Sequence, residues 1–96
     1  MEPEVAQFLA ELEPCVFILD AVPNMNAELV RERFVPFVRI LRAAHPETPF
    51  VLIEDRAWTN TPFLPQKQAH HAATRAAIAE AYERLQAENT GNLSFI

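Results

Sequence analysis

The segment Cys15-Val16-Phe17-Ile18-Leu19-Asp20 decides the fold of this 96-residue chain. Its first five residues are all apolar, and a short, continuous apolar run of this kind is typical of a strand that is buried on both faces. The run Phe50-Val51-Leu52-Ile53 repeats the pattern and is followed by Glu54 and Asp55. We therefore expect two strands, each buried between two layers of helices.

Stretches with the helical spacing of apolar residues surround these two strands. Their expected bounds are Pro3 to Leu12, Ala27 to Ala44 and Gln66 to Glu88. Pro36 lies inside the second stretch, where it is expected to kink the helix or to remove one backbone hydrogen bond. Asn89-Thr90-Gly91 is expected to end the third helix, and Asn92 to Ile96 is expected to begin a third strand.

The order αβαβαβ predicts an α/β fold with about three parallel strands and right-handed crossovers. This is a partial three-layer αβα architecture. A sheet of three strands is narrow, yet every strand has the apolar pattern of a central strand. At least one of them must lie at an edge, with unpaired backbone groups and exposed apolar surface. We therefore expect the chain to be a segment of a larger domain that self-associates or needs missing flanking segments.

Composition excludes several classes of function. The net charge is −5, with 13 acidic and 8 basic residues, so we expect no nucleic-acid groove and no binding to an anionic membrane surface. The longest apolar run is far shorter than the ~20 residues of a membrane-spanning helix. The acidic residues Glu2 and Glu4 argue against a signal peptide. The lone Cys15 fits a reducing compartment, and we expect a cytoplasmic protein.

Cofactor and metal sites are also not expected. Gly91 is the only glycine, so no glycine-rich loop is available to bind a phosphate group. The adjacent His70 and His71 would point about 100° apart on a helix and would not converge on one metal ion. We expect His71 to pack or to cap instead. Cys15 is expected to be buried and inert at the start of its strand.

Ligands of open α/β sheets bind beyond the carboxyl ends of the strands. Two turns follow such ends here, Asp20 to Asn26 and Glu54 to Trp58. Glu54 and Asp55 are neighbouring carboxylates on opposite faces, for which a structural role, either facing a helix or paired with Arg56, is favoured over acid–base catalysis. Trp58 and Phe63 either line the mouth of a site or cover the apolar sheet.

The stretch Phe17 to Met25 resembles the third conserved block of the SGNH (GDSL-type) hydrolases, in which a buried strand runs into a G-x-N-D turn. The similarity to one branch of that superfamily extends over nearly the whole chain. The residues that carry it are Leu19-Asp20, Pro23-Asn24-Met25, Glu32-Arg33, Pro36 to Arg42, Ala44-His45-Pro46, Thr48-Pro49 and Glu54-Asp55-Arg56. In the turn itself, Val22 replaces the usual glycine and Met25 replaces the usual acid.

The resemblance implies a flavodoxin-like SGNH fold and one functional residue, Asn24, as an oxyanion-hole donor. The alternative is that Asn24 is simply a turn residue. Pro23, Met25, Arg56 and Trp58, from the two turns, are the expected contacts to substrate. The nucleophilic serine of a GDS motif, the glycine block and the D-x-x-H motif of the family are all absent, and the only serine is Ser94.

We therefore expect residues 1–96 to be the central part of a serine esterase domain that is inactive alone. Its parent would hydrolyse an ester of a small acyl group, on a sugar or a lipid. The alternative is a small α/β binding or assembly module without enzymatic activity, which docks through an exposed sheet edge. A small metal-dependent enzyme that uses Glu54, Asp55 and the histidine pair is the least favoured reading.

Overall fold

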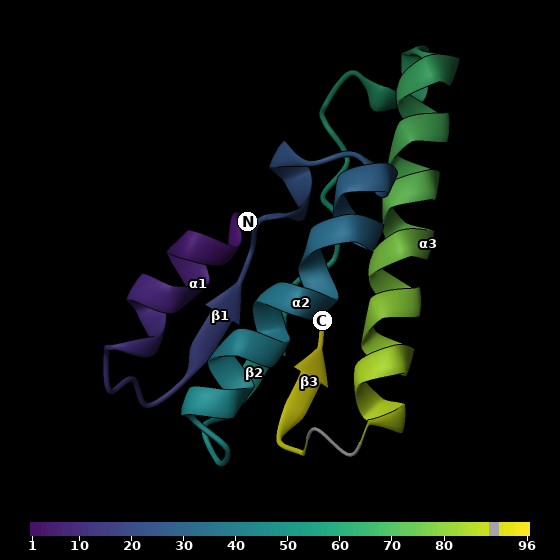
Figure 1. Ribbon diagram of the computed structural model, residues 1–96. Coiled ribbons are helices and arrows are strands. Elements are labelled where there is room, and N and C mark those ends of the chain that lie inside the picture. The colour runs from purple at the N-terminus through teal and green to yellow at the C-terminus, as the bar shows by residue number, and fades with distance from the viewer. Residues whose placement is uncertain (89–90) are drawn as a thin grey trace.

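Three helices and three strands alternate along the chain (Figure 1), and the computed structural model describes residues 1–88 and 91–96. The elements are α1 (Pro3–Ala10), β1 (Phe17–Leu19), η1 (Val22–Asn24), α2 (Ala27–Ala44), β2 (Phe50–Leu52), η2 (Thr61–Phe63), α3 (Pro65–Ala87) and β3 (Leu93–Phe95), where η marks a 3-10 turn. The expected order αβαβαβ is confirmed. The helix end expected at Asn89 and Thr90 lies outside the described residues. Gly91 adopts φ +62°, the left-handed conformation that glycine tolerates best, but it lies three residues beyond Glu88, the C-cap of α3.

The strands form one parallel sheet in the order β1-β2-β3. Phe17 pairs with Phe50, and Phe50 pairs with Leu93. Because all strands run in the same direction, their carboxyl ends meet at one edge of the sheet. β2 is the central strand, and both β1 and β3 have an unpaired side within the described part of the chain.

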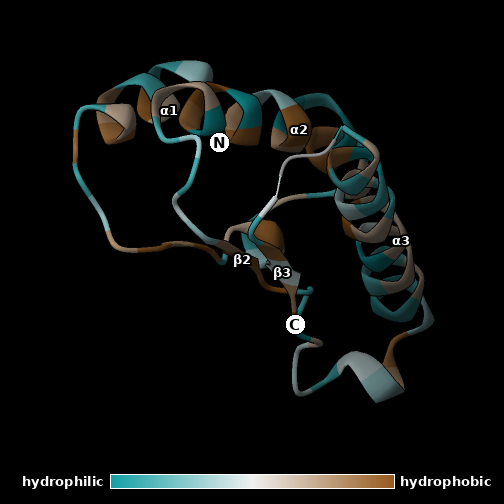
Figure 2. Cartoon of the chain, turned by 90° about the horizontal axis from the view of Figure 1, so that it is seen from below, coloured by the Kyte–Doolittle hydropathy of each residue, from teal (hydrophilic) through white to brown (hydrophobic). Residues whose placement is uncertain are grey.

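All three helices lie on the same face of the sheet (Figure 2). Phe17, Leu19, Phe50 and Leu52 point into a single core with these helices, and each is at most 7% exposed. Ile18 points to the other face and is 61% exposed. The expectation that β1 is buried between two helical layers is therefore wrong for residues 1–88 and 91–96. We call this bare side, formed by Val16, Ile18, Val51, Ile53, Ser94 and Ile96, the uncovered face.

Local sequence signals explain where the helices begin. Asn26 caps α2, since its side-chain Oδ1 accepts a hydrogen bond from the Leu29 backbone N–H at 2.9 Å. Proline occupies the first position of both α1 and α3, where its missing N–H costs nothing. Helix α2 continues through Pro36, which lies on its exposed side. Water can therefore satisfy the carbonyl that Pro36 leaves unbonded.

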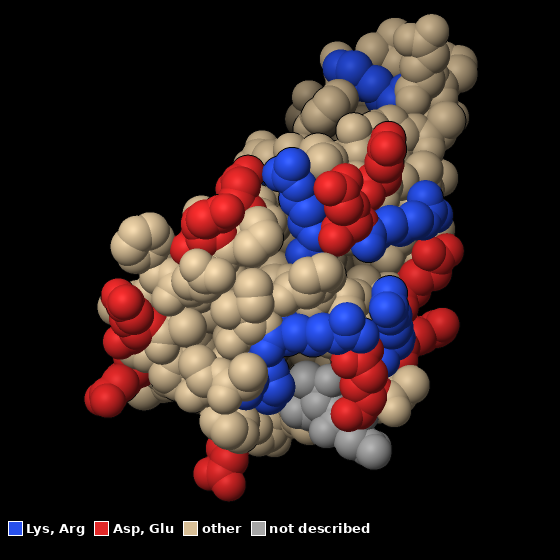
Figure 3. Space-filling model, in the orientation of Figure 1, with Lys and Arg blue, Asp and Glu red and all other residues tan. Residues whose placement is uncertain are grey.

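Ion pairs connect the helices on their outer surface, where arginine and glutamate side chains lie next to one another (Figure 3). Arg31 of α2 pairs with Glu80 of α3 at 3.2 Å. Arg39 of α2 pairs at 2.8 Å with Glu88, the residue directly after α3. The hydrogen bond from Arg39 lowers the pKa of Glu88 below its ordinary value. Exposed pairs of this kind each contribute only ~0–1 kcal/mol, so the apolar core dominates the stability.

Arg42 holds the amino ends of the strands together. Its guanidinium donates to the carbonyl oxygen of Thr48, at 2.5 Å, and of Gly91, at 2.7 Å. Further bonds reach the carbonyls of His45 and Pro46, at 3.2 and 3.1 Å. The charge also lies 4.3 Å from the centre of the Phe50 ring. Burial lowers the pKa of Arg42, but arginine remains charged in proteins.

The first strand begins later than expected. Its first ladder bond runs from the Phe17 N–H to the Pro49 carbonyl, so Cys15 precedes the sheet. Cys15 is exposed, and the expectation that it is a buried thiol is wrong. Among the helices of the described residues, none is long and apolar enough to cross a bilayer.

Candidate functional site

The carboxyl edge of the sheet brings the two predicted turns together. Asp20 and η1 follow β1, and residues 53–60 follow β2. Arg56 Nη2 lies 3.2 Å from Asp20 Oδ2, so an ion pair joins the two turns directly. The side chain of Arg56 is 68% exposed, so this pair contributes little stability. It nevertheless shows that the two segments lie next to each other along this edge.

Asn24 lies at the end of the 3-10 turn η1. Two buried side chains anchor the turn in the core. Val22 is fully buried, and Met25 is 8% exposed. The backbone N–H of Asn24 bonds to the Ala21 carbonyl at 3.1 Å and closes the turn. Its side chain is exposed and has no hydrogen-bond partner within residues 1–88 and 91–96. A backbone hydrogen bond and two buried side chains thus position this turn, while the donors of the Asn24 amide remain available to a ligand.

The other residues expected to contact substrate occupy different environments. Pro23 is partly buried within η1, and Met25 belongs to the hydrophobic core. Trp58 is 44% exposed. Phe63, on η2, is 82% exposed and covers nothing in the described part of the chain. Contact between these residues and a substrate stays a prediction.

Three ring or charge contacts hold the indole of Trp58 over the start of α3. The ring stacks on His70 with centroids 5.7 Å apart, and it meets His71 edge-on at 4.9 Å. The ammonium of Lys67 lies 4.7 Å from the centre of the indole, in a cation–π contact. One part of the indole is therefore packed, and the rest faces solvent beside the turn that carries Arg56.

Asp55, His71 and Thr74 form a buried polar cluster beneath Trp58. Their exposed fractions are 3%, 2% and 0%. Asp55 Oδ2 accepts hydrogen bonds from His71 Nδ1 at 2.5 Å and from Thr74 Oγ1 at 2.6 Å. Asp55 thus faces helix α3, which confirms one of the two structural roles expected for it. The other expected role, a pairing with Arg56, is wrong, since Arg56 pairs with Asp20. The sequence signal for this cluster is a pair of polar residues, three apart, on the apolar side of α3.

The imidazole rings of His70 and His71 lie next to each other on α3. Their centroids are 5.2 Å apart and their planes meet at 75°, so the two rings make an edge-on contact. No group of three or more histidine, cysteine or acidic residues in the described ranges is placed to hold a metal ion. Ser94 lies within β3 and points to the uncovered face, so it does not join Asn24 at the carboxyl edge.

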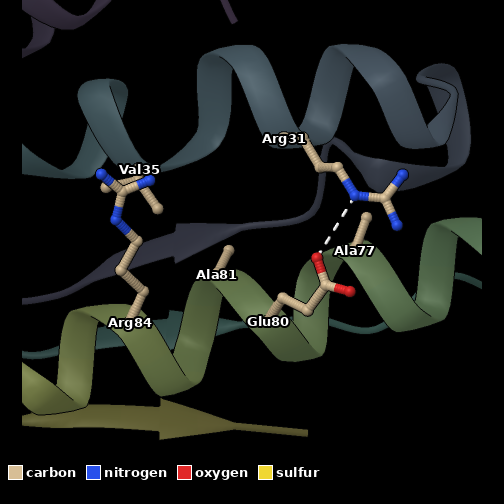
Figure 4. Close-up of a pocket in the computed structure, with 6 residues that line it drawn as sticks. All are labelled: Arg31, Val35, Ala77, Glu80, Ala81 and Arg84. Carbon is tan, nitrogen blue, oxygen red and sulfur yellow. Dashed lines mark hydrogen bonds and ion pairs between the residues drawn. The ribbon is translucent and has the colours of Figure 1, made fainter.

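A groove lies between α2 and α3 (Figure 4). This groove has a volume of about 230 Å³ and is lined by Arg31, Val35, Ala77, Glu80, Ala81 and Arg84. Arg31 and Glu80 pair with each other across it, which satisfies much of its charge. It offers no nucleophile, and it lies on the helical layer instead of at the strand ends. We therefore place the candidate site at the carboxyl edge.

Comparison with known proteins gives the family to which the chain is similar. The model of the GDSL-like lipase/acylhydrolase family matches residues 1–96. A crystal structure from Bacteroides ovatus, described as that of a GDSL-like lipase, is 38% identical and superposes with a TM-score of 0.97. The match covers 100% of this chain and 28% of that one.

A more distant structure shares the fold alone. It is the salicylyl-acyltransferase SsfX3 from a tetracycline biosynthetic pathway, which is 22% identical with a TM-score of 0.80. That match covers 99% of this chain and 28% of the other. A search among curated proteins found no match. The chain thus spans little more than a quarter of the length of either solved structure.

Proposed function

Because the chain belongs to the GDSL-like lipase/acylhydrolase family, we propose that it is the central part of an SGNH-type serine ester hydrolase and that Asn24 supplies an oxyanion-hole donor. The observation that carries the proposal is the side-chain amide of Asn24. It stands on an anchored turn at the carboxyl edge, and its donors form no hydrogen bond within the described residues. Asn26, two residues further on, uses its side chain to cap α2, as a purely structural asparagine would.

The chemistry would follow the acyl-transfer pattern of such enzymes. A serine hydroxyl attacks the acyl carbonyl carbon while a histidine removes its proton. Negative charge builds up on the carbonyl oxygen, and the Asn24 N–H donates a hydrogen bond to it. The histidine then protonates the leaving alcohol, and water releases the acid in the same way. Serine and histidine must come from segments other than residues 1–96, which hold neither motif. The substrate class is an ester of a small acyl group, on a sugar or a lipid.

The proposal predicts that residues 1–96 alone do not hydrolyse p-nitrophenyl acetate above the buffer background. The chain provides a single donor for the oxyanion but no serine paired with a base, so the attack that forms the acyl-enzyme cannot take place. Release of nitrophenolate, followed by absorbance, measures this. Turnover that persists in both Asn24→Ala and Ser94→Ala would refute the mechanism, because neither residue would then be needed.

The uncovered face supports the view that the chain functions as part of something larger. Ile18 and Ile96 are 61% and 74% exposed on it, and exposed apolar surface of this kind on the face of a sheet marks an interaction site. We assign the partner at this site to the remainder of the same domain. When the remainder is missing, a second copy of the chain is the nearest available apolar surface, so the isolated chain should self-associate.

Ile18→Glu is expected to weaken that self-association by about tenfold or more, because an unpaired carboxylate buried in the contact is costly. Light scattering over a concentration series measures the change. Phe8→Glu is the matched control, since Phe8 is a comparable apolar residue, 72% exposed, on α1. If Phe8→Glu dissociates the complex and Ile18→Glu does not, or if the wild-type chain is a monomer at all concentrations, the proposal for the uncovered face fails.

The second candidate is a binding or assembly module that has no enzymatic activity. It is favoured by the unpaired sides of β1 and β3 in the described residues, since strand edges are templates for an added strand. The adjacent coding sequence distinguishes the two candidates. A GDS motif upstream together with a D-x-x-H motif downstream supports the hydrolase. Stop codons on both sides, with a stable folded product, support the module.

A further inference from the structure

The contacts of the buried cluster of Asp55, His71 and Thr74 determine which ring nitrogen of His71 carries the proton. The Trp58 backbone N–H points at His71 Nε2 from 3.4 Å. An N–H group only donates, so Nε2 must be the unprotonated, accepting nitrogen. The proton of neutral His71 then lies on Nδ1, where the Asp55 carboxylate accepts it. Both contacts thus require the same tautomer.

A chain of contacts therefore runs from the end of β2 to the exposed indole. Asp55 orients the His71 ring, and the ring accepts from the Trp58 backbone and packs against its side chain. Thr74 adds a second donor to Asp55 but makes no contact with Trp58 that would hold it. Two residues later in the chain, Asn60 is tied to Lys67, whose ammonium also lies over the indole.

Stability alone is a weak reason for this cluster. Burying a carboxylate with a histidine costs desolvation that the pairing only partly offsets, and apolar replacements of buried charged groups are often neutral or stabilising. One oxygen of Asp55, Oδ1, is buried without a partner in the described residues, which adds to the cost. An arrangement that contributes so little to folding is better explained by what it orients.

We propose that Asp55 and His71 are positioning residues that hold the Trp58 segment as a wall beside the Asn24 turn. The Arg56–Asp20 pair joins this wall to the turn that follows β1. Fixed in this way, the exposed part of the indole presents a flat apolar surface at the carboxyl edge. The nature of the substrate that this wall would contact rests on the proposed function. The positioning of Trp58 by Asp55 and His71 does not depend on that function.

Two substitutions separate the two contacts of His71. His71→Asn puts an amide near the position of Nδ1, so it still donates to Asp55 but no longer reaches Trp58. His71→Gln puts an amide near the position of Nε2, so it still reaches Trp58 but not Asp55. Thr74→Val is the control for stability, because it removes one hydrogen bond to Asp55 and leaves Trp58 untouched.

The measurements are made on the full chain and need no catalysis, so they remain valid if the proposed function fails. Amide hydrogen exchange of Trp58 reports its backbone contact, and acrylamide quenching reports on the only tryptophan in the chain. We expect His71→Asn to accelerate exchange at Trp58 by about tenfold and to increase quenching. His71→Gln keeps an acceptor near Trp58 but loses the bond that orients it to Asp55, so exchange and quenching should lie between those of the wild type and those of His71→Asn. Thr74→Val should leave both near the wild-type values.

Two results overturn the proposal. The first is equal exchange at Trp58 in the wild type and His71→Asn, or an equal acceleration by Thr74→Val, which would reduce the cluster to a stability element. The second is found in the wild-type chain alone, by nitrogen NMR of the imidazole rings. A proton on Nε2 of His71, in place of Nδ1, contradicts the contact to Trp58 whether or not any variant folds.

Discussion

Asn24→Ala is expected to lower kcat by ~10²–10³-fold in a protein that contains these residues together with a serine nucleophile and a histidine base. The removed amide donates to the oxyanion in the transition state, where the charge is largest, so kcat should fall far more than KM changes. Initial rates with a p-nitrophenyl ester measure both constants.

The neighbouring Asn26→Ala provides the matched control for this experiment. It removes the cap of α2 and should cost ~1 kcal/mol of stability, without touching the oxyanion. A loss of kcat in Asn26→Ala as large as that in Asn24→Ala would mean that the turn, and not the amide of Asn24, matters. Activity of Asn24→Ala within twofold of the wild type would exclude Asn24 from the oxyanion hole.

Arg42→Met is expected to reduce the free energy of unfolding by ~2–4 kcal/mol, the largest effect on stability among the residues discussed. Methionine keeps the apolar stem but cannot donate hydrogen bonds to the carbonyls of Thr48 and Gly91. These carbonyls belong to the loop before β2 and the loop before β3. Hydrogen bonds from a charged donor are each worth ~1.5–3 kcal/mol, and not all are replaced by water. Thermal melts should show a midpoint lowered by about 10–20 °C.

Arg31→Met serves as the comparison, because its ion pair with Glu80 lies on the surface with the arginine 53% exposed. We expect this variant to change stability by no more than ~1 kcal/mol. Arg42→Lys should fall between the two, since an ammonium keeps the charge but cannot span both loops. Equal melting temperatures for Arg42→Met and Arg31→Met would show that the guanidinium of Arg42 does not hold the strands together.

The order and direction of the elements follow from patterns in the sequence, whereas the number of layers does not. The run around Ile18 is apolar on both sides, and this pattern correctly predicts a strand. The pattern does not say, however, on which face the helices pack. Ile18 is exposed because no helix of the described residues covers its face, while its neighbours Phe17 and Leu19 face the helices.

The candidate site, too, is predictable from the sequence only in part. Asn24 is predictable because its turn directly follows a strand, and local sequence places it at the carboxyl edge. The contact of Asp55 with His71 is not predictable in this way, since it depends on the path of residues 56–64 between β2 and α3. Patterns along the chain place His71 on the inner side of its helix, but only the folded loop determines which polar group it meets.

The position of all three helices on one face also sets an order of assembly. Each helix is followed in the chain by the strand that it covers, so every βαβ crossover is complete once its second strand has been synthesised. No later segment has to pass behind an earlier one to form this layer. The helical layer can therefore form progressively as the polypeptide leaves the ribosome.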